Sequence, residues 1–97
     1  MLGAEIENLR HRAEAGDVWA MREFATWLLI GAMVRIAAGL GRPDDMVTMA
    51  VAWVFRAAQS GDRTASDWLP EIGESISPDS WEAAKATVQD MEIRSLQ

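Results

Sequence analysis

The sequence predicts an all-α protein of about five helices. Apolar residues recur at spacings of three and four along most of the 97 residues, and glycine, proline and aspartate interrupt this recurrence at intervals. No segment alternates apolar and polar residues for long enough to form a strand. At this length we expect one domain, residues 1–97, with one modest core.

The first helix is expected over residues 4–15, because its apolar residues fall on one face. These residues are Ile6, Leu9 and Ala13. Gly16 follows in the position of a C-cap glycine, and Asp17 in that of an N-cap for the next helix.

The second helix begins near Val18 and extends to residue 29, or as far as residue 38. Its apolar residues form two stripes, one of Ala20, Phe24 and Leu28 and the other of Trp19, Trp27, Ile30 and Val34, interrupted by Glu23. A helix that is apolar on several sides is central in a fold or offers a face to a partner. Residues 24–40 are mostly apolar, but this run is short for a membrane span and contains Arg35, so we expect a buried helix.

Glycines and Pro43 break the chain after this helix, and Pro43 disfavours helical geometry at Arg42. Asp44 or Asp45 then caps a third helix over residues 46–60. Its apolar face consists of Met49, Ala50, Trp53, Val54 and Ala57.

Two helices are expected in the final third of the chain. A short one covers residues 63–69, since Pro70 weakens its continuation. Ser77 and Pro78 then start the last helix, over residues 79–94, as a cap followed by proline at the first helical position. Its apolar residues in register are Trp81, Ala84, Val88 and Met91.

The chain also repeats itself with an offset of 45 residues. The matching pairs are Ala13 and Ala58, Gly16 and Gly61, Asp17 and Asp62, and Ala20 and Ala65. In each copy a small residue near a helix end allows close packing, the glycine turns the chain, and the aspartate starts a new helix.

These residues resemble the Sel-one-like repeat family, which is related to the tetratricopeptide repeats. The first helix of the unit matches at Ala20, Phe24, Ala25, Leu28 and Gly31, and the second at Asp45, Ala50, Trp53, Ala57, Ala58 and Gly61. A degraded second unit has Ala65, Leu69, Gly73, Asp79 and Ala83. Leu28 replaces the family's tyrosine, Ala25 and Pro70 replace its glycines, and the loop over residues 31–45 is longer than usual.

The resemblance covers about 50 residues well. It implies antiparallel helix pairs stacked as a short right-handed superhelix, with residues 1–16 as a leading helix, 17–61 as the first repeat and 62–97 as a degraded second repeat or cap. It also implies an adaptor or scaffold that binds protein and performs no chemistry. Roughly three repeats are needed for independent stability, so either the flanking helices act as caps or an apolar face is covered by another chain, with a two-fold homodimer favoured.

The charge of the chain also favours a protein as the partner. The net charge is −6, which disfavours nucleic acid and anionic membrane as partners. The C-terminal third is the acidic end, with eight acids and three bases in residues 62–97. There is no cysteine, and no signal-peptide pattern opens the chain, so a cytoplasmic protein is expected.

The sequence gives little support for a catalytic or a metal site. His11 lies between two arginines, which is typical of a solvated surface residue. Capping explains Asp44 and Asp45, and a solvated turn explains Glu71, Glu74 and Asp79. We therefore expect no enzyme, no metal and no cofactor.

The best candidate site is a protein-binding surface of tryptophan, arginine and their neighbours, since tryptophan and arginine dominate interface hot spots. Its residues are Trp19, Arg22, Glu23, Trp27, Ile30, Val34, Arg35, Trp68, Glu71 and Glu74. Trp53 is assigned to the core, and Trp81 to a contact at the start of the last helix. An alternative function is a small acidic inhibitor or decoy, such as a phage-encoded protein of the anti-CRISPR kind, that blocks a basic nucleic-acid-binding surface.

Overall fold

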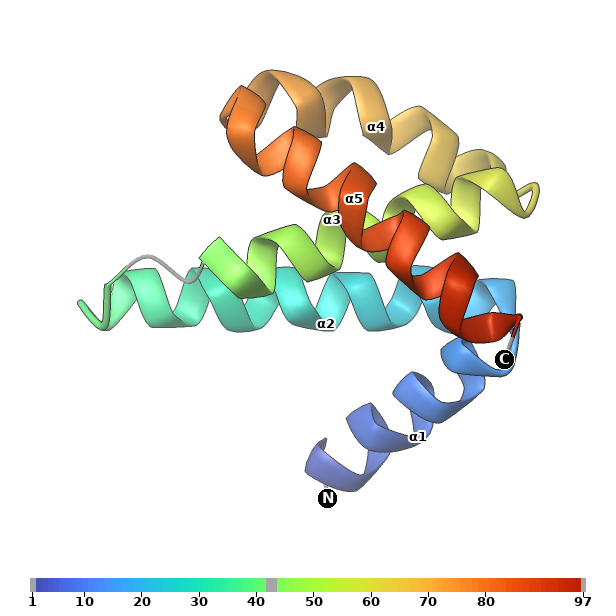
Figure 1. The fold of residues 1–97 in the computed structure, drawn as a ribbon. Coiled ribbons are helices and arrows are strands. Elements are labelled where there is room, and N and C mark those ends of the chain that lie inside the picture. Colours follow the sequence, from blue (N-terminus) through green and yellow to red (C-terminus); the bar gives the residue numbers. More distant parts are fainter. Residues whose placement is uncertain (1, 42–43, 97) are drawn as a thin grey trace.

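The structure is a computed structural model that describes residues 2–41 and 44–96, and it confirms an all-helical chain (Figure 1). These residues form five helices and no strand. The helices are α1 (Leu2–Glu14), α2 (Val18–Ala37), α3 (Asp44–Gln59), α4 (Arg63–Ser75) and α5 (Pro78–Ser95). The break predicted at Arg42 and Pro43 lies outside the described residues.

The two aligned turns, between α1 and α2 and between α3 and α4, have the same geometry. Gly16 and Gly61 adopt φ values of 102° and 100°, in the region that favours glycine. The Asp17 carboxylate accepts a hydrogen bond from the backbone N–H of Ala20 at 3.1 Å, and the Asp62 carboxylate accepts the matching bond at 2.9 Å. The identical residues at the two turns therefore form the same local structure, in which a glycine ends one helix and an aspartate caps the next.

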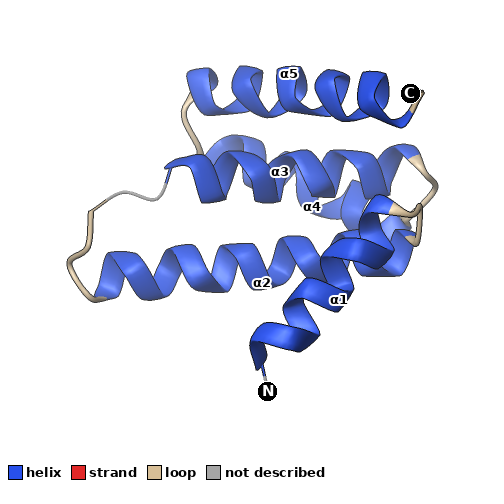
Figure 2. Cartoon of the chain, turned by 60° about the horizontal axis from the view of Figure 1, so that its bottom comes forward, coloured by secondary structure: helices blue, strands red, loops and turns tan. Residues whose placement is uncertain are grey.

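Helix α3 is the centre of the fold, because it packs against α2, α4 and α5 (Figure 2). Its face toward the other helices is rich in small residues, and Ala50, Ala52 and Ala57 are fully buried. A side chain at Gly31 of α2 would lie 2.8 Å from the end of Met46. Small residues at these positions allow α2 and α3 to approach closely.

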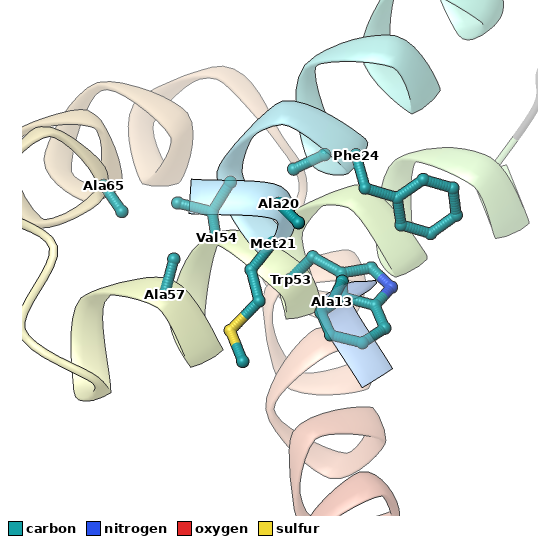
Figure 3. Packing of buried hydrophobic residues seen from close by; sticks show 9 residues of the cluster. Ala13, Ala20, Met21, Phe24, Trp53, Val54, Ala57 and Ala65 are labelled. Carbon is teal, nitrogen blue, oxygen red and sulfur yellow. The ribbon is translucent and has the colours of Figure 1, made fainter. Parts of the chain in front are cut away.

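The core lies where α1, α2, α3 and α4 meet (Figure 3). Trp53 is 3% exposed, which confirms its assignment to packing, and the rings of Trp53 and Phe24 meet edge to face with centroids 5.9 Å apart. Trp81 packs at the start of α5 as expected, with its ring centroid 4.8 Å from that of Phe55. The predicted apolar register of α5 is also confirmed, since Ala84 and Val88 are buried.

The second helix pair is not a copy of the first. Helix α5 crosses α3, and α4 packs more extensively on α3 than on α5 (Figure 1). Helices α2 and α3, in contrast, form the most extensive helix contact in the described part of the chain.

Helix α2 ends at Ala37, close to the longer of its two predicted ends, because no helix breaker occurs between Gly31 and Gly39. The loop expected over residues 31–45 is therefore wrong in its first part, since residues 31–37 are helical. The predicted end of α4 is also wrong. Helix α4 continues through Pro70 to Ser75. Proline at that position removes one backbone hydrogen bond, and the packing of α4 side chains against the core offsets this loss.

The predicted cap of α3 also differs. Asp44 and Asp45 lie inside the first turn of α3, where a carboxylate interacts favourably with the positive end of the helix dipole. In the described residues, no helix combines the length and the apolar composition that crossing a bilayer requires.

Candidate protein-binding surfaces

Exposed apolar side chains gather on the C-terminal half of α2 and just beyond it. They are Ile30, Met33, Val34, Ile36 and Leu40, each 43–68% exposed. We call this set the α2 apolar surface. Figures 1 and 2 both show this end of α2 extending past the ends of α3 and α5.

An apolar groove of about 440 Å³ opens beside this surface, between α2, α3 and α4. We call it the α2–α4 groove. Its apolar lining comes from Leu29, Ile30 and Met33 of α2, Val47 and Val51 of α3, and Trp68, Ile72 and Ile76 of α4 and its cap. Glu71 lies at its edge. The fold thus brings three predicted site residues together at this groove: Ile30, Trp68 and Glu71.

Three further predicted residues lie on exposed positions of the same two helices. Val34 and Arg35 lie on the end of α2, and Glu74 lies on α4 one residue before its end. In the part of the chain that the structure describes, the side chains of Arg35, Glu71 and Glu74 form no ion pair. Of these three charged residues only Glu71 lines the groove, since Arg35 lies on the side of α2 opposite the residues that line it.

The remaining predicted residues lie toward the N-terminal half of α2. Trp19 is half exposed, and the Arg12 guanidinium lies 5.3 Å from its ring centroid. Arg22 instead forms an ion pair with Asp62 at 3.1 Å, with both side chains mostly buried. Glu23 and Trp27 are partly buried, and Trp27 lies outside the main core cluster.

A second cleft, of about 490 Å³, was not anticipated from the sequence. It lies between α1, α2, α3 and α5, and we call it the arginine cleft. It is lined by Arg10, Glu14, Phe24, Met49, Trp53, Arg56, Met91 and Arg94. One signal was available in the sequence, since Arg56 and Arg94 each lie three residues after an apolar core position and so share its helix face.

The electrostatics of this cleft are set by Arg10. Its guanidinium donates to Glu7 at 2.6 Å and to Glu14 at 2.8 Å. The hydrogen bond from Arg10 holds the pKa of Glu7 below its usual value, and the same bond raises the pKa of Arg10. Arg56 is arranged differently, because its guanidinium lies 5.1 Å over the ring of Trp53.

The described residues contain no group of histidine, cysteine and acidic side chains that could hold a metal ion, and His11 is exposed. No protein-family model, curated protein or solved structure matches the chain.

Proposed function

We propose that this chain is a small, non-enzymatic helical-repeat protein that binds protein through the α2 apolar surface and the α2–α4 groove, and that its first partner is a second copy of itself. The observation that carries the proposal is the exposure of five large apolar side chains at one end of α2. The repeated glycine–aspartate turn supports a Sel-one-like layout of helix pairs stacked in a right-handed superhelix.

Burial of the α2 apolar surface by a partner is favourable in free energy. Full burial of one such side chain contributes about 1.5–3 kcal/mol, so covering the exposed parts of five contributes roughly 4–9 kcal/mol before the costs of association. The groove adds further apolar area beside them. Contiguous exposed apolar side chains often mark a site of interaction with another protein, and the α2 apolar surface fits this pattern.

An exposed apolar helix end beside an apolar groove favours a second copy as the occupant. A two-fold interface places the same surface on both partners, so a contact from one chain is repeated in reverse by the other. Pairing the end of α2 with the groove of a second copy would place Met33 and Ile36 against the groove of the partner, and reciprocally. One such interface would cover both the helix end and the groove of each chain.

Sizing by light scattering over a range of protein concentrations tests this proposal. The wild-type chain should be a dimer, and the double variant Met33→Glu/Ile36→Glu should be a monomer with an unchanged helical circular dichroism spectrum. Ile93→Glu is the matched control, because Ile93 is 56% exposed on α5, away from this surface. A monomeric wild-type protein, or equal dissociation by Ile93→Glu, would overturn the proposal.

A second candidate function is the acidic decoy. It is favoured by the exposed acids Asp67, Glu71, Glu74 and Asp79, which form no ion pair within the described residues. A decoy that presents these carboxylates to a basic surface would lose affinity steeply as salt increases, whereas binding through apolar contacts would not.

Retention on immobilised poly-L-lysine across a sodium chloride gradient tests the decoy. The variant Asp67→Asn/Glu71→Gln/Glu74→Gln should elute at clearly lower salt than a control of equal charge change, Glu5→Gln/Asp44→Asn/Asp45→Asn. Equal elution of the two variants would remove the case for an acidic binding face on α4.

A further inference from the structure

The arginine cleft has a charge opposite to that of the chain around it. The chain carries a net charge of −6, yet three of its nine basic residues meet in one cleft. They come from three different helices, with Arg10 on α1, Arg56 on α3 and Arg94 on α5. The volume of about 490 Å³ lies in the range of pockets that hold one small ligand or a short piece of peptide.

The three guanidiniums differ in whether they already have carboxylate partners. Arg10 is held by two carboxylates, Glu7 and Glu14. Arg56 is held over the Trp53 ring, and in the described residues neither Arg56 nor Arg94 has a carboxylate partner. Two planar forks of N–H donors therefore remain available at the cleft, and this is the donor geometry that binds a carboxylate in a bidentate manner.

The floor of the cleft is apolar. Phe24 and Trp53 meet edge to face there, with Met49 and Met91 beside them. Methionine side chains adapt to ligands of irregular shape and contact aromatic rings favourably. Phe24 and Trp53 are only 6% and 3% exposed, so the aromatic or aliphatic body of a ligand would contact mainly Met49 and Met91 while its carboxylate meets the guanidiniums of Arg56 and Arg94.

The net charge around the arginine cleft favours a ligand with a single negative charge. The lining contains three guanidiniums and the carboxylate of Glu14, and Glu7, which pairs with Arg10, reduces the local charge to +1. The remainder of the chain is acidic and repels a polyanion such as nucleic acid or polyphosphate.

From these contacts we infer that the arginine cleft binds a monocarboxylate attached to an aromatic or aliphatic group. The carboxylate can belong to a free acid or to an acidic residue in a peptide. This site is separate from the α2 apolar surface and does not depend on the function proposed above.

Side-chain resonances in ¹⁵N-correlated NMR spectra test the inference with defined probes. Titration with N-acetyl-L-phenylalanine should shift the Trp53 indole N–H and the Arg56 Nε–H in a saturable way. N-acetyl-L-phenylalaninamide, which keeps the body and lacks the charge, should bind at least tenfold more weakly. Equal affinities for the two probes, or no saturable shift with the acid, would overturn the inference.

Variants then locate the site. Arg94→Gln, an exposed change in the last turn of α5, should weaken binding of the acid about tenfold, and Arg56→Gln should do the same. Arg63→Gln removes an exposed guanidinium on α4 and serves as the control. Unchanged affinity in Arg94→Gln, or equal weakening in Arg63→Gln, would refute the assignment.

Two blocked dipeptides separate the sources of the carboxylate. If acetyl-Glu-Phe-amide binds as tightly as the free acid and acetyl-Gln-Phe-amide does not, the site accepts an acidic side chain of a protein. If acetyl-Glu-Phe-amide binds tenfold more weakly than N-acetyl-L-phenylalanine, the site requires a free acid or a chain terminus. Both results retain the monocarboxylate site and distinguish the two kinds of carboxylate that it can accept.

Discussion

Replacing Asp62 with alanine should destabilise the fold more than the matched replacement of Asp17, although both aspartates cap the same turn. Loss of the cap to the Ala65 N–H costs about 1 kcal/mol. Asp62 also pairs with Arg22 at 3.1 Å, and their side chains are 17% and 22% exposed, so loss of this pair costs about 1 kcal/mol more. The partner of Asp17 is Arg12, and that pair is more exposed, so Asp17→Ala loses little beyond its cap.

Urea denaturation and thermal melting, both followed by circular dichroism, measure the difference. Asp62→Ala should lose about 2 kcal/mol of unfolding free energy, equivalent to a decrease in Tm of roughly 8–16 °C for a chain of this size. A double-mutant cycle with Arg22→Ala should give a coupling of about 1 kcal/mol with Asp62→Ala and none with Asp17→Ala. Equal losses for the two aspartates, with no coupling to Arg22, would refute this reasoning.

Three further predictions concern other parts of the molecule. The pKa of the Asp17 carboxyl is lowered in the folded chain, first by the hydrogen bond from the Ala20 N–H and then by the Arg12 guanidinium. The ionised carboxylate therefore stabilises the fold fully above its unfolded pKa of about 3.9, and this stabilisation is lost as the pH falls through the lower folded pKa. Asp17→Asn should flatten that part of the curve of urea midpoint against pH, and an unchanged curve would contradict it. Trp27→Ala should raise the dimer dissociation constant measured by light scattering and cost less free energy of unfolding than of association. Equal losses of the two free energies would place Trp27 in the core. Gly61→Ala should cost about 1–2 kcal/mol in urea denaturation because its φ is 100°, and a neutral effect would show that the turn relaxes.

The helices and their turns could be predicted because the signals for them are local. Gly16 with Asp17, and Gly61 with Asp62, specify a stop and a start within two residues, and the structure uses both in the same way. The end of α4 could not be predicted in this manner. Pro70 is unfavourable locally, and the compensating contacts of Trp68 and its neighbours with the core come from other helices.

The candidate sites depend even more on distant contacts. Arg22 has the composition of an interface residue, but it pairs with Asp62, which lies 40 residues away in the sequence. The arginine cleft is built from four helices, so no single segment shows it. The α2 apolar surface was partly visible, since Ile30 and Val34 lie on the second stripe of α2, whereas the distribution of burial among the tryptophans required the packed structure.

The length of α2 links the fold to its proposed function. Helix α2 has 20 residues, whereas α3 has 16 and α4 has 13, and its C-terminal end extends past the ends of α3 and α5 (Figures 1 and 2). A helix end that only meets water needs polar side chains, yet this one carries Met33, Val34 and Ile36, each more than half exposed. The core does not account for these residues, because they are largely exposed. Substitution of all three with glutamine should therefore abolish the dimer, preserve the helical circular dichroism spectrum and remove the dependence of Tm on protein concentration.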